Sequence, residues 1–65
     1  MFIELDTVND GKKSLINLNN VIDIQVENSV SRVYYVGDGF AYVDVLNTYD
    51  EIKTMLLNAG VKIIE

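Results

Sequence analysis

The sequence predicts a mainly β, α+β fold: a five-stranded antiparallel β-meander, curled or half-barrel in shape, with one C-terminal helix. Three observations predict this fold. Apolar and polar residues alternate in five short segments, which is the pattern of half-buried strands. Turn-forming Gly and Asn residues separate these segments. The last apolar segment has helical spacing instead, behind a capping sequence. At 65 residues, the chain is predicted to be a single domain, 1–65.

The first two strands form a predicted hairpin around Asp10-Gly11, a favoured pair for a two-residue hairpin turn. With this turn, Leu5 lies opposite Ile16 and Ile3 lies opposite Leu18. Apolar partners then meet on one face. The five predicted strands are residues 1–8, 15–18, 21–27, 32–36 and 40–46.

The third strand leads into a predicted four-residue loop at 28–31. This loop places Val26 opposite Val33 and Glu27 opposite Arg32. Arg32 then lies between two carboxylates on one sheet face, which predicts a cross-strand ion-pair ladder.

The hairpin at residues 32–46 has a register set by its loop, Gly37-Asp38-Gly39. A three-residue loop needs positive φ at its last residue, and Gly39 supplies it. Opposed residues share a face of the sheet, so the hairpin sorts its side chains into two sets. The inner set is an apolar core face: Val33, Tyr35, Ala41, Val43 and Val45. The outer set is Arg32, Tyr34, Val36, Phe40, Tyr42 and Asp44.

A helix is predicted from about residue 49 to 59. Thr48 and Glu51 have capping-box spacing, and Gly60 is the expected residue after the helix. The tail, 61–65, predicts either a short strand or strap across the core, or edge pairing with a second chain. The apolar stripe of the helix is Ile52, Met55, Leu56 and Ala59, and the strands offer it a continuous apolar face: Ile3, Leu5, Ile16, Leu18, Ile22, Ile24, Val26, Val33, Tyr35, Val43 and Val45.

Composition excludes several kinds of site. The chain has no Cys and no His, which removes disulfides, thiolate metal sites and the commonest zinc ligand, and we predict no cofactor or metal. Self-association is then the remaining way to stabilise so short a chain. The net charge of −5 disfavours binding to nucleic acid or to anionic membranes. No apolar run approaches the ~20 residues of a membrane span, so a cytoplasmic protein is expected.

The outer set of the hairpin predicts the function. It is too apolar for an ordinary solvent face, and the ends of the patch are charged, as the rim of an interface is. We therefore predict a small acidic protein–protein interaction module that associates with itself or with a protein partner through Arg32, Tyr34, Val36, Phe40, Tyr42 and Asp44. Two structural alternatives would remove this surface: the helix packs on it, or the sheet curls until both faces are partly buried.

Other functions stay open at this point. An acidic inhibitor or nucleic-acid mimic would bind a basic partner with Glu4, Asp6, Asp23, Glu27 and Asp44. A sugar-binding surface would stack its ligand on Tyr34, Phe40 and Tyr42. Enzymatic activity is not predicted, because 65 residues leave little room for a cleft and the spacing of the carboxylates does not support a two-carboxylate site.

The layout resembles the FlbD-like small flagellar-operon proteins, and also small phage- and prophage-encoded proteins of unknown role. The resemblance covers about residues 2–57 and implies a small β-rich fold with a capped helix. It carries over no functional residue. The matching pieces are Ile3-Glu4-Leu5, Asn9-Asp10-Gly11-Lys12, residues 16–22, Gly37-Asp38-Gly39 and Tyr49-Asp50-Glu51-Ile52.

Overall fold

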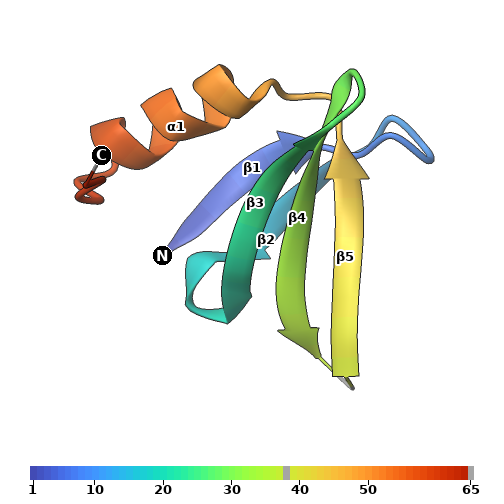
Figure 1. Cartoon of the computed structure of the whole chain (residues 1–65), viewed down its shortest axis with the longest axis horizontal. Helices are drawn as coiled ribbons and strands as arrows, with labels where there is room; N and C mark the ends of the chain where they lie inside the picture. The colour runs from blue at the N-terminus through green and yellow to red at the C-terminus, as the bar shows by residue number, and fades with distance from the viewer. Residues whose placement is uncertain (38, 65) are drawn as a thin grey trace.

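Five antiparallel strands form two sheets, and one helix follows them (Figure 1). The computed structural model describes residues 1–37 and 39–64, and at residue 40 the backbone alone. The mainly β, α+β fold class is confirmed. The first sheet pairs β1 (Phe2–Asp6) with β2 (Lys13–Asn17). The second has the order β3 (Val21–Glu27), β4 (Val30–Gly37) and β5 (Gly39–Val45), and α1 (Tyr49–Asn58) follows it.

The predicted continuous meander is wrong at one connection, because β2 does not pair with β3. A short 3₁₀ helix, η1 (Leu18–Asn20), carries the chain from one sheet to the other. Asn17 stabilises this turn, since its side-chain Oδ1 accepts a hydrogen bond from the Asn19 N–H at 3.0 Å. Leu18 N–H is held by the Met1 carbonyl at 3.0 Å. Asn side chains cap such turns readily, and here the cap redirects the chain.

The two sheets join instead at the end of β1. Leu46 N–H donates to the Asp6 carbonyl at 2.7 Å, and Val8 N–H donates to the Asp44 carbonyl at 3.0 Å. These bonds place the last residues of β5 beside the first hairpin. In Figure 1, β1 and β2 consequently lie behind the three-stranded sheet.

The register of the first hairpin differs from the prediction by two residues. Ile3 lies opposite Ile16, and Leu5 lies opposite Ser14. The loop is longer than two residues because Asp10 organises it: its carboxylate accepts hydrogen bonds from the Thr7 hydroxyl and from the backbone N–H two residues later. A shift of two residues preserves the alternation of faces, so the apolar side chains still point inward.

The second hairpin is also shifted by two residues, because its loop has two residues rather than four. Glu27 pairs with Val30, and Asn28 adopts the left-handed conformation, with φ of 54°, that this tight connection needs. Val26 therefore lies opposite Ser31, and Arg32 lies opposite Gln25 rather than Glu27. The predicted Glu27–Arg32 pairing is wrong.

Strand β3 contributes less to the core than its alternation predicts. Its register with β4 shifts between Val21 and Asp23, which is a β-bulge, and the bulge directs Val21 toward the core in place of Ile22. Ile22 is 50% exposed, and Val26, near the end of this edge strand, is 62% exposed. Both were predicted to be core residues.

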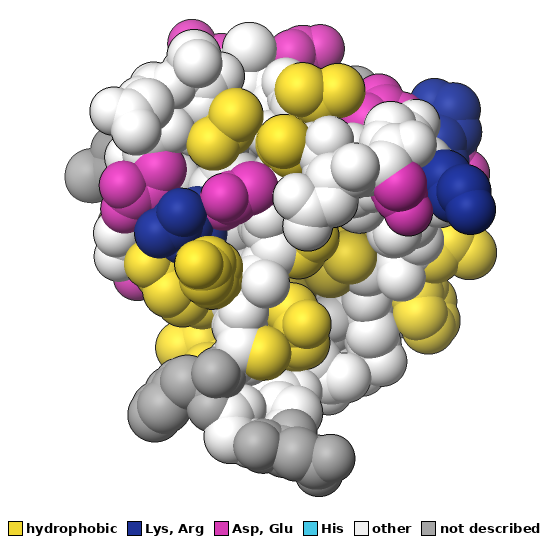
Figure 2. Space-filling model, turned by 90° about the vertical axis from the view of Figure 1, so that its right-hand side faces the viewer, with side chains coloured by type: hydrophobic (Ala, Val, Ile, Leu, Met, Phe, Trp, Pro, Cys, Tyr) yellow, Lys and Arg dark blue, Asp and Glu magenta, His cyan; other side chains and the backbone are white. Residues whose placement is uncertain are grey.

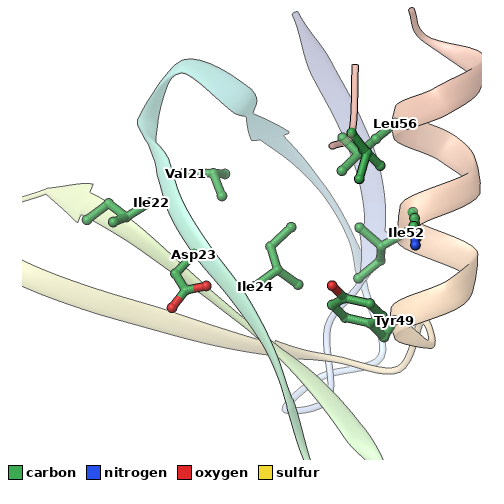
Figure 3. A pocket seen from close by; sticks show the side chains of 9 residues that line it. Val21, Ile22, Asp23, Ile24, Tyr49, Ile52 and Leu56 are labelled. Atoms are coloured by element: carbon green, nitrogen blue, oxygen red, sulfur yellow. The ribbon is translucent and has the colours of Figure 1, made fainter. Parts of the chain in front are cut away.

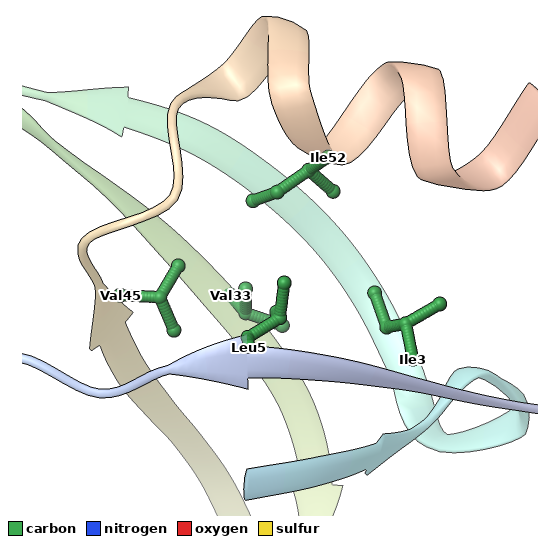
Figure 4. Packing of buried hydrophobic residues seen from close by; sticks show 5 residues of the cluster. All are labelled: Ile3, Leu5, Val33, Val45 and Ile52. Atoms are coloured by element: carbon green, nitrogen blue, oxygen red, sulfur yellow. The ribbon is translucent and has the colours of Figure 1, made fainter. Parts of the chain in front are cut away.

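The core lies between the two sheets and under the helix (Figure 4). Each of its fully buried apolar side chains stabilises the fold by about 1.5–3 kcal/mol relative to exposure. Ile52 comes from the helix, so α1 packs on the inner face of the sheet. Partly buried neighbours of the core include Ile16, Leu18, Ile24, Val43, Met55 and Leu56, whereas Ala59 is exposed. The buried core is Ile3, Leu5, Val33, Val45 and Ile52.

The helix has the predicted ends. Thr48 and Glu51 form the capping box, with Glu51 N–H donating to the Thr48 hydroxyl at 3.1 Å and Thr48 N–H donating to the Glu51 carboxylate at 2.9 Å. Gly60 has φ of 86°, and Val61 N–H donates to the Leu56 carbonyl at 2.9 Å, which is a Schellman ending. Beyond it, residues 61–64 form no strand, so the predicted terminal strand is wrong for this part of the tail.

Candidate interaction surface

The register of the β4–β5 hairpin matches the sequence prediction along its whole length. Arg32 lies opposite Asp44, Tyr34 lies opposite Tyr42, and the Val36 backbone lies opposite residue 40. We call the side of the hairpin that carries these residues the hairpin outer face. Gly39 has φ of 112°, as the predicted loop requires, while Asp38 and the side chain of Phe40 lie outside the described part of the chain.

The remaining elements pack on the opposite side of this sheet. Ile52 of the helix is buried in one cluster with Val33 and Val45, whose side chains belong to the inner set. Figure 1 shows α1 beside the β3 edge, β1 and β2 behind the sheet, and no described element in front of it. The helix therefore does not cover the hairpin outer face. Val36 is 59% exposed and Tyr42 is 50% exposed, so curling of the sheet does not bury them either.

Arg32 and Asp44 form a bidentate ion pair across the two strands. The Arg32 Nε donates to Asp44 Oδ1 at 2.8 Å, and an Arg32 terminal nitrogen donates to Oδ2 at 3.2 Å. The hydrogen bonds from Arg32 hold the pKa of Asp44 below its ordinary value. The same bonds raise the pKa of Arg32, which stays charged at every physiological pH. Both side chains are about three-quarters buried, with 27% and 29% exposed.

The ion pair also organises the aromatic side chains. The Arg32 guanidinium carbon lies 4.1 Å from the centre of the Tyr42 ring, a cation–π distance. The Tyr42 ring lies 5.9 Å from that of Tyr34, tilted by 38°. The Arg32 guanidinium therefore contacts both the Asp44 carboxylate and the Tyr42 ring.

The neighbouring strand extends this surface with residues that the sequence reasoning did not include. Gln25 lies opposite Arg32, and Asp23 lies opposite Tyr34. The Gln25 side-chain amide donates to an Asp23 carboxylate oxygen at 2.7 Å. With the four-residue loop predicted at 28–31, Glu27 rather than Gln25 would lie opposite Arg32, because that loop moves β3 along β4 by two residues.

The acidic residues predicted for an inhibitor or mimic do not form one surface. Glu4 and Asp6 lie in the first sheet beside Lys13, whose Nζ is 3.0 Å from Asp6 and 4.0 Å from Glu4. Asp44 is paired with Arg32 in the second sheet. Ion pairing offsets part of the negative charge at Glu4, Asp6 and Asp44. Within residues 1–37 and 39–64, no three acidic side chains gather closely enough to hold a metal ion.

Figure 2 shows the molecule turned so that the β5 side of Figure 1 faces the viewer. On the left of this view, a basic side chain lies between acidic ones, directly above hydrophobic side chains. Apolar and charged groups therefore lie next to each other on this side of the molecule.

No protein-family model, curated protein or solved structure matches this chain. The resemblance to FlbD-like and phage-encoded proteins accordingly stays an expectation from the sequence. The described residues contain no helix that is both long and apolar enough to cross a membrane.

Proposed function

We propose that this protein is a small interaction module that associates with a second copy of itself through the hairpin outer face. One observation carries the proposal. The face is uncovered by the described chain, yet it bears Tyr34, Val36 and Tyr42 in a fixed arrangement. Contiguous exposed apolar patches on small proteins usually mark interfaces, and Tyr is enriched there.

A two-fold axis through the sheet face would bring two copies of this surface together. The apolar centre would meet its own copy, and the Arg32–Asp44 pairs would lie toward the rim. A stable interface buries about 800 Å² on each partner. The whole molecule exposes 4669 Å², so one sheet face of about a sixth of that area is sufficient.

The test is the mass in solution of wild-type protein and of Tyr42→Glu, measured by sedimentation equilibrium across a range of concentrations. The wild type is expected to approach the dimer mass. Tyr42→Glu replaces the aromatic ring at the centre of the patch with a carboxylate and is expected to weaken the dimer at least about tenfold, because apolar contact is lost and burying a charge is costly.

Leu57→Glu is the matched control, since Leu57 is 52% exposed on the helix, away from the sheet face. Its mass is expected to equal that of the wild type. High salt is also expected to leave the dimer intact, because salt screens charge pairs more than apolar contacts. A monomeric wild type, or equal masses for wild type and Tyr42→Glu, would refute the proposal.

A further inference from the structure

The edge of β3 that faces away from β4 borders an apolar groove, on a different side of the molecule from the hairpin outer face. Among the described strands, β3 pairs with β4 alone, so its other backbone edge has no strand partner. The helix α1 forms the opposite wall of the groove, which has a volume of about 310 Å³. Asp23 and Lys53 are its charged lining residues, and the apolar lining is Val21, Ile22, Ile24, Tyr49, Ile52, Leu56 and Ile63.

The side chains around this groove divide by direction. Figure 3 shows Val21 and Ile24 pointing toward Ile52 and Leu56 of the helix, while Asp23 points away from them. Next along the same strand, Val26 lines a second hollow of about 290 Å³ with Tyr49, beside polar residues that include Asn28, Thr48 and Asp50. Val21, Ile24 and Val26 therefore form an apolar track along the inward side of this edge, and its Val26 end has polar surroundings.

At Val26 the apolar track is not covered by the rest of the described chain. Val26 is an apolar residue on the strand beside the core, yet it is 62% exposed. An additional strand beside β3 would cover it and would use the unpaired backbone groups of the edge. Exposed strand edges bind extended peptides in this way, with main-chain hydrogen bonds for affinity and alternate side chains for specificity.

The acidic side chains on the outward side of β3 indicate which side chains an added strand would have opposite them. Asp23 and Glu27 lie on this side, with the neutral Gln25 between them. Basic side chains on an added strand would face these carboxylates, and the net charge of −5 would favour the approach of a basic segment.

We propose that the β3 edge binds an extended segment of another protein in which apolar and basic residues alternate. The apolar residues would enter the groove between β3 and α1, and the basic residues would lie opposite Asp23 and Glu27. This inference does not rest on self-association through the hairpin outer face, because its apolar contacts lie in the groove between β3 and α1, although Asp23 borders both surfaces.

The chain itself shows that an isoleucine fits here. Ile63 of the C-terminal tail lines the groove and is half-buried, although residues 61–64 form no strand. The order Val61-Lys62-Ile63 has the same apolar–basic–apolar pattern that the edge would select. The added segment would occupy the β3 edge that this tail leaves unpaired.

The probe is a labelled peptide with blocked ends, Lys-Val-Lys-Ile-Lys-Val-Lys, titrated with the full-length protein and followed by fluorescence anisotropy. Saturable binding is expected. A peptide of the same composition in the order Lys-Lys-Val-Ile-Val-Lys-Lys, and one with every Lys replaced by Glu, are expected to bind at least about tenfold more weakly.

Variants of the protein locate the site. Val26→Asp, at an exposed position, is expected to weaken peptide binding at least about tenfold. Asp23→Lys combined with Glu27→Lys is expected to weaken it by a similar factor. Leu57→Asp, on the helix, is the matched control that should leave the affinity within about twofold. Circular dichroism confirms that each variant is folded.

Amide NMR shifts on adding the peptide are expected in residues 21–27 and 49–56. Binding that ignores the order of the peptide, or that survives Val26→Asp, would overturn the proposal. So would shifts centred on Tyr34 and Tyr42. If the protein alone shows concentration-dependent shifts in the groove that Ile64→Glu abolishes, the occupant is the tail of a second copy, which also overturns it.

Discussion

Arg32 is the residue on which the hairpin outer face depends most directly. It binds the Asp44 carboxylate with two nitrogens and lies against the Tyr42 ring. Replacing it with Lys would keep the charge but lose the planar fork that makes both contacts at once. A single side chain therefore connects the charged rim of the surface to its aromatic centre.

The ion pair predicts a loss of stability in acid. The folded-state pKa of Asp44 is lowered by Arg32, so its contribution is fully present above the ordinary Asp pKa of about 3.9 and disappears as pH falls through the lower folded value. Urea unfolding at pH 7 and near pH 2.5 is expected to show a larger loss for wild type than for Asp44→Asn. Some loss remains in the variant, because the Thr7 hydroxyl likewise lowers the pKa of Asp10. Equal losses in both proteins would show that the ion pair contributes nothing.

Asn47 joins three parts of the fold. Its side-chain oxygen accepts a hydrogen bond from the Asp6 N–H at 2.7 Å, and its backbone carbonyl accepts one from the buried Ser31 hydroxyl at 2.8 Å. Asn47→Ala is expected to lower the free energy of unfolding by about 1–3 kcal/mol, because it leaves the Asp6 N–H without its partner. Asn58→Ala, at the exposed end of the helix, serves as control and should stay within about 0.5 kcal/mol in urea unfolding. An equal effect of the two substitutions would contradict this role.

At the scale of elements, the loops explain which predictions failed. Strand positions follow from alternation, but register follows from loop conformation. Asp10 accepts two hydrogen bonds that lengthen the first loop, and Asn28 adopts positive φ and shortens the second. Neither choice is visible in the apolar pattern, because a slip of two residues leaves the same side chains facing inward. On either side of Gly37-Asp38-Gly39, only one register separates the apolar core residues from the other residues of the hairpin. That predicted register is confirmed.

The short second loop makes its own prediction. A residue other than Gly, Asn or Asp in the left-handed region costs roughly 1–2 kcal/mol. Asn28→Ala is therefore expected to lower the free energy of unfolding by about 1 kcal/mol, whereas Asn28→Gly should be neutral or slightly stabilising. Ser29→Ala, the adjacent loop position, is the comparison, and thermal unfolding is the measurement. If Asn28→Ala were as stable as Ser29→Ala, the loop would not have the conformation described.

The helix was predictable almost completely, because its signals are local. Thr48, Glu51 and Gly60 lie within one turn of the ends that they define, and each does what its position implies. The path between the sheets was not predictable in the same way. It depends on η1 and on hydrogen bonds between β1 and the end of β5, which join residues about forty positions apart.

At the scale of the whole molecule, we propose two binding surfaces, and the sequence indicated only one of them. The hairpin outer face could be recognised because Tyr34, Val36 and Tyr42 are surplus to the core. The β3 groove could not, since Ile22 and Val26 read as core residues until the bulge and the edge position of β3 are known. The two surfaces meet at Asp23, which lies opposite Tyr34 and also lines the β3 groove.

The most direct test of self-association is isotope-filtered NMR on an equal mixture of labelled and unlabelled protein, which detects contacts between copies alone. The account predicts intermolecular contacts among Tyr34, Val36 and Tyr42, and their loss in Tyr42→Glu. Intermolecular contacts confined to other residues, such as those of the β3 groove or the helix, would contradict it. A mixture with no intermolecular contacts at millimolar concentration would contradict it as well.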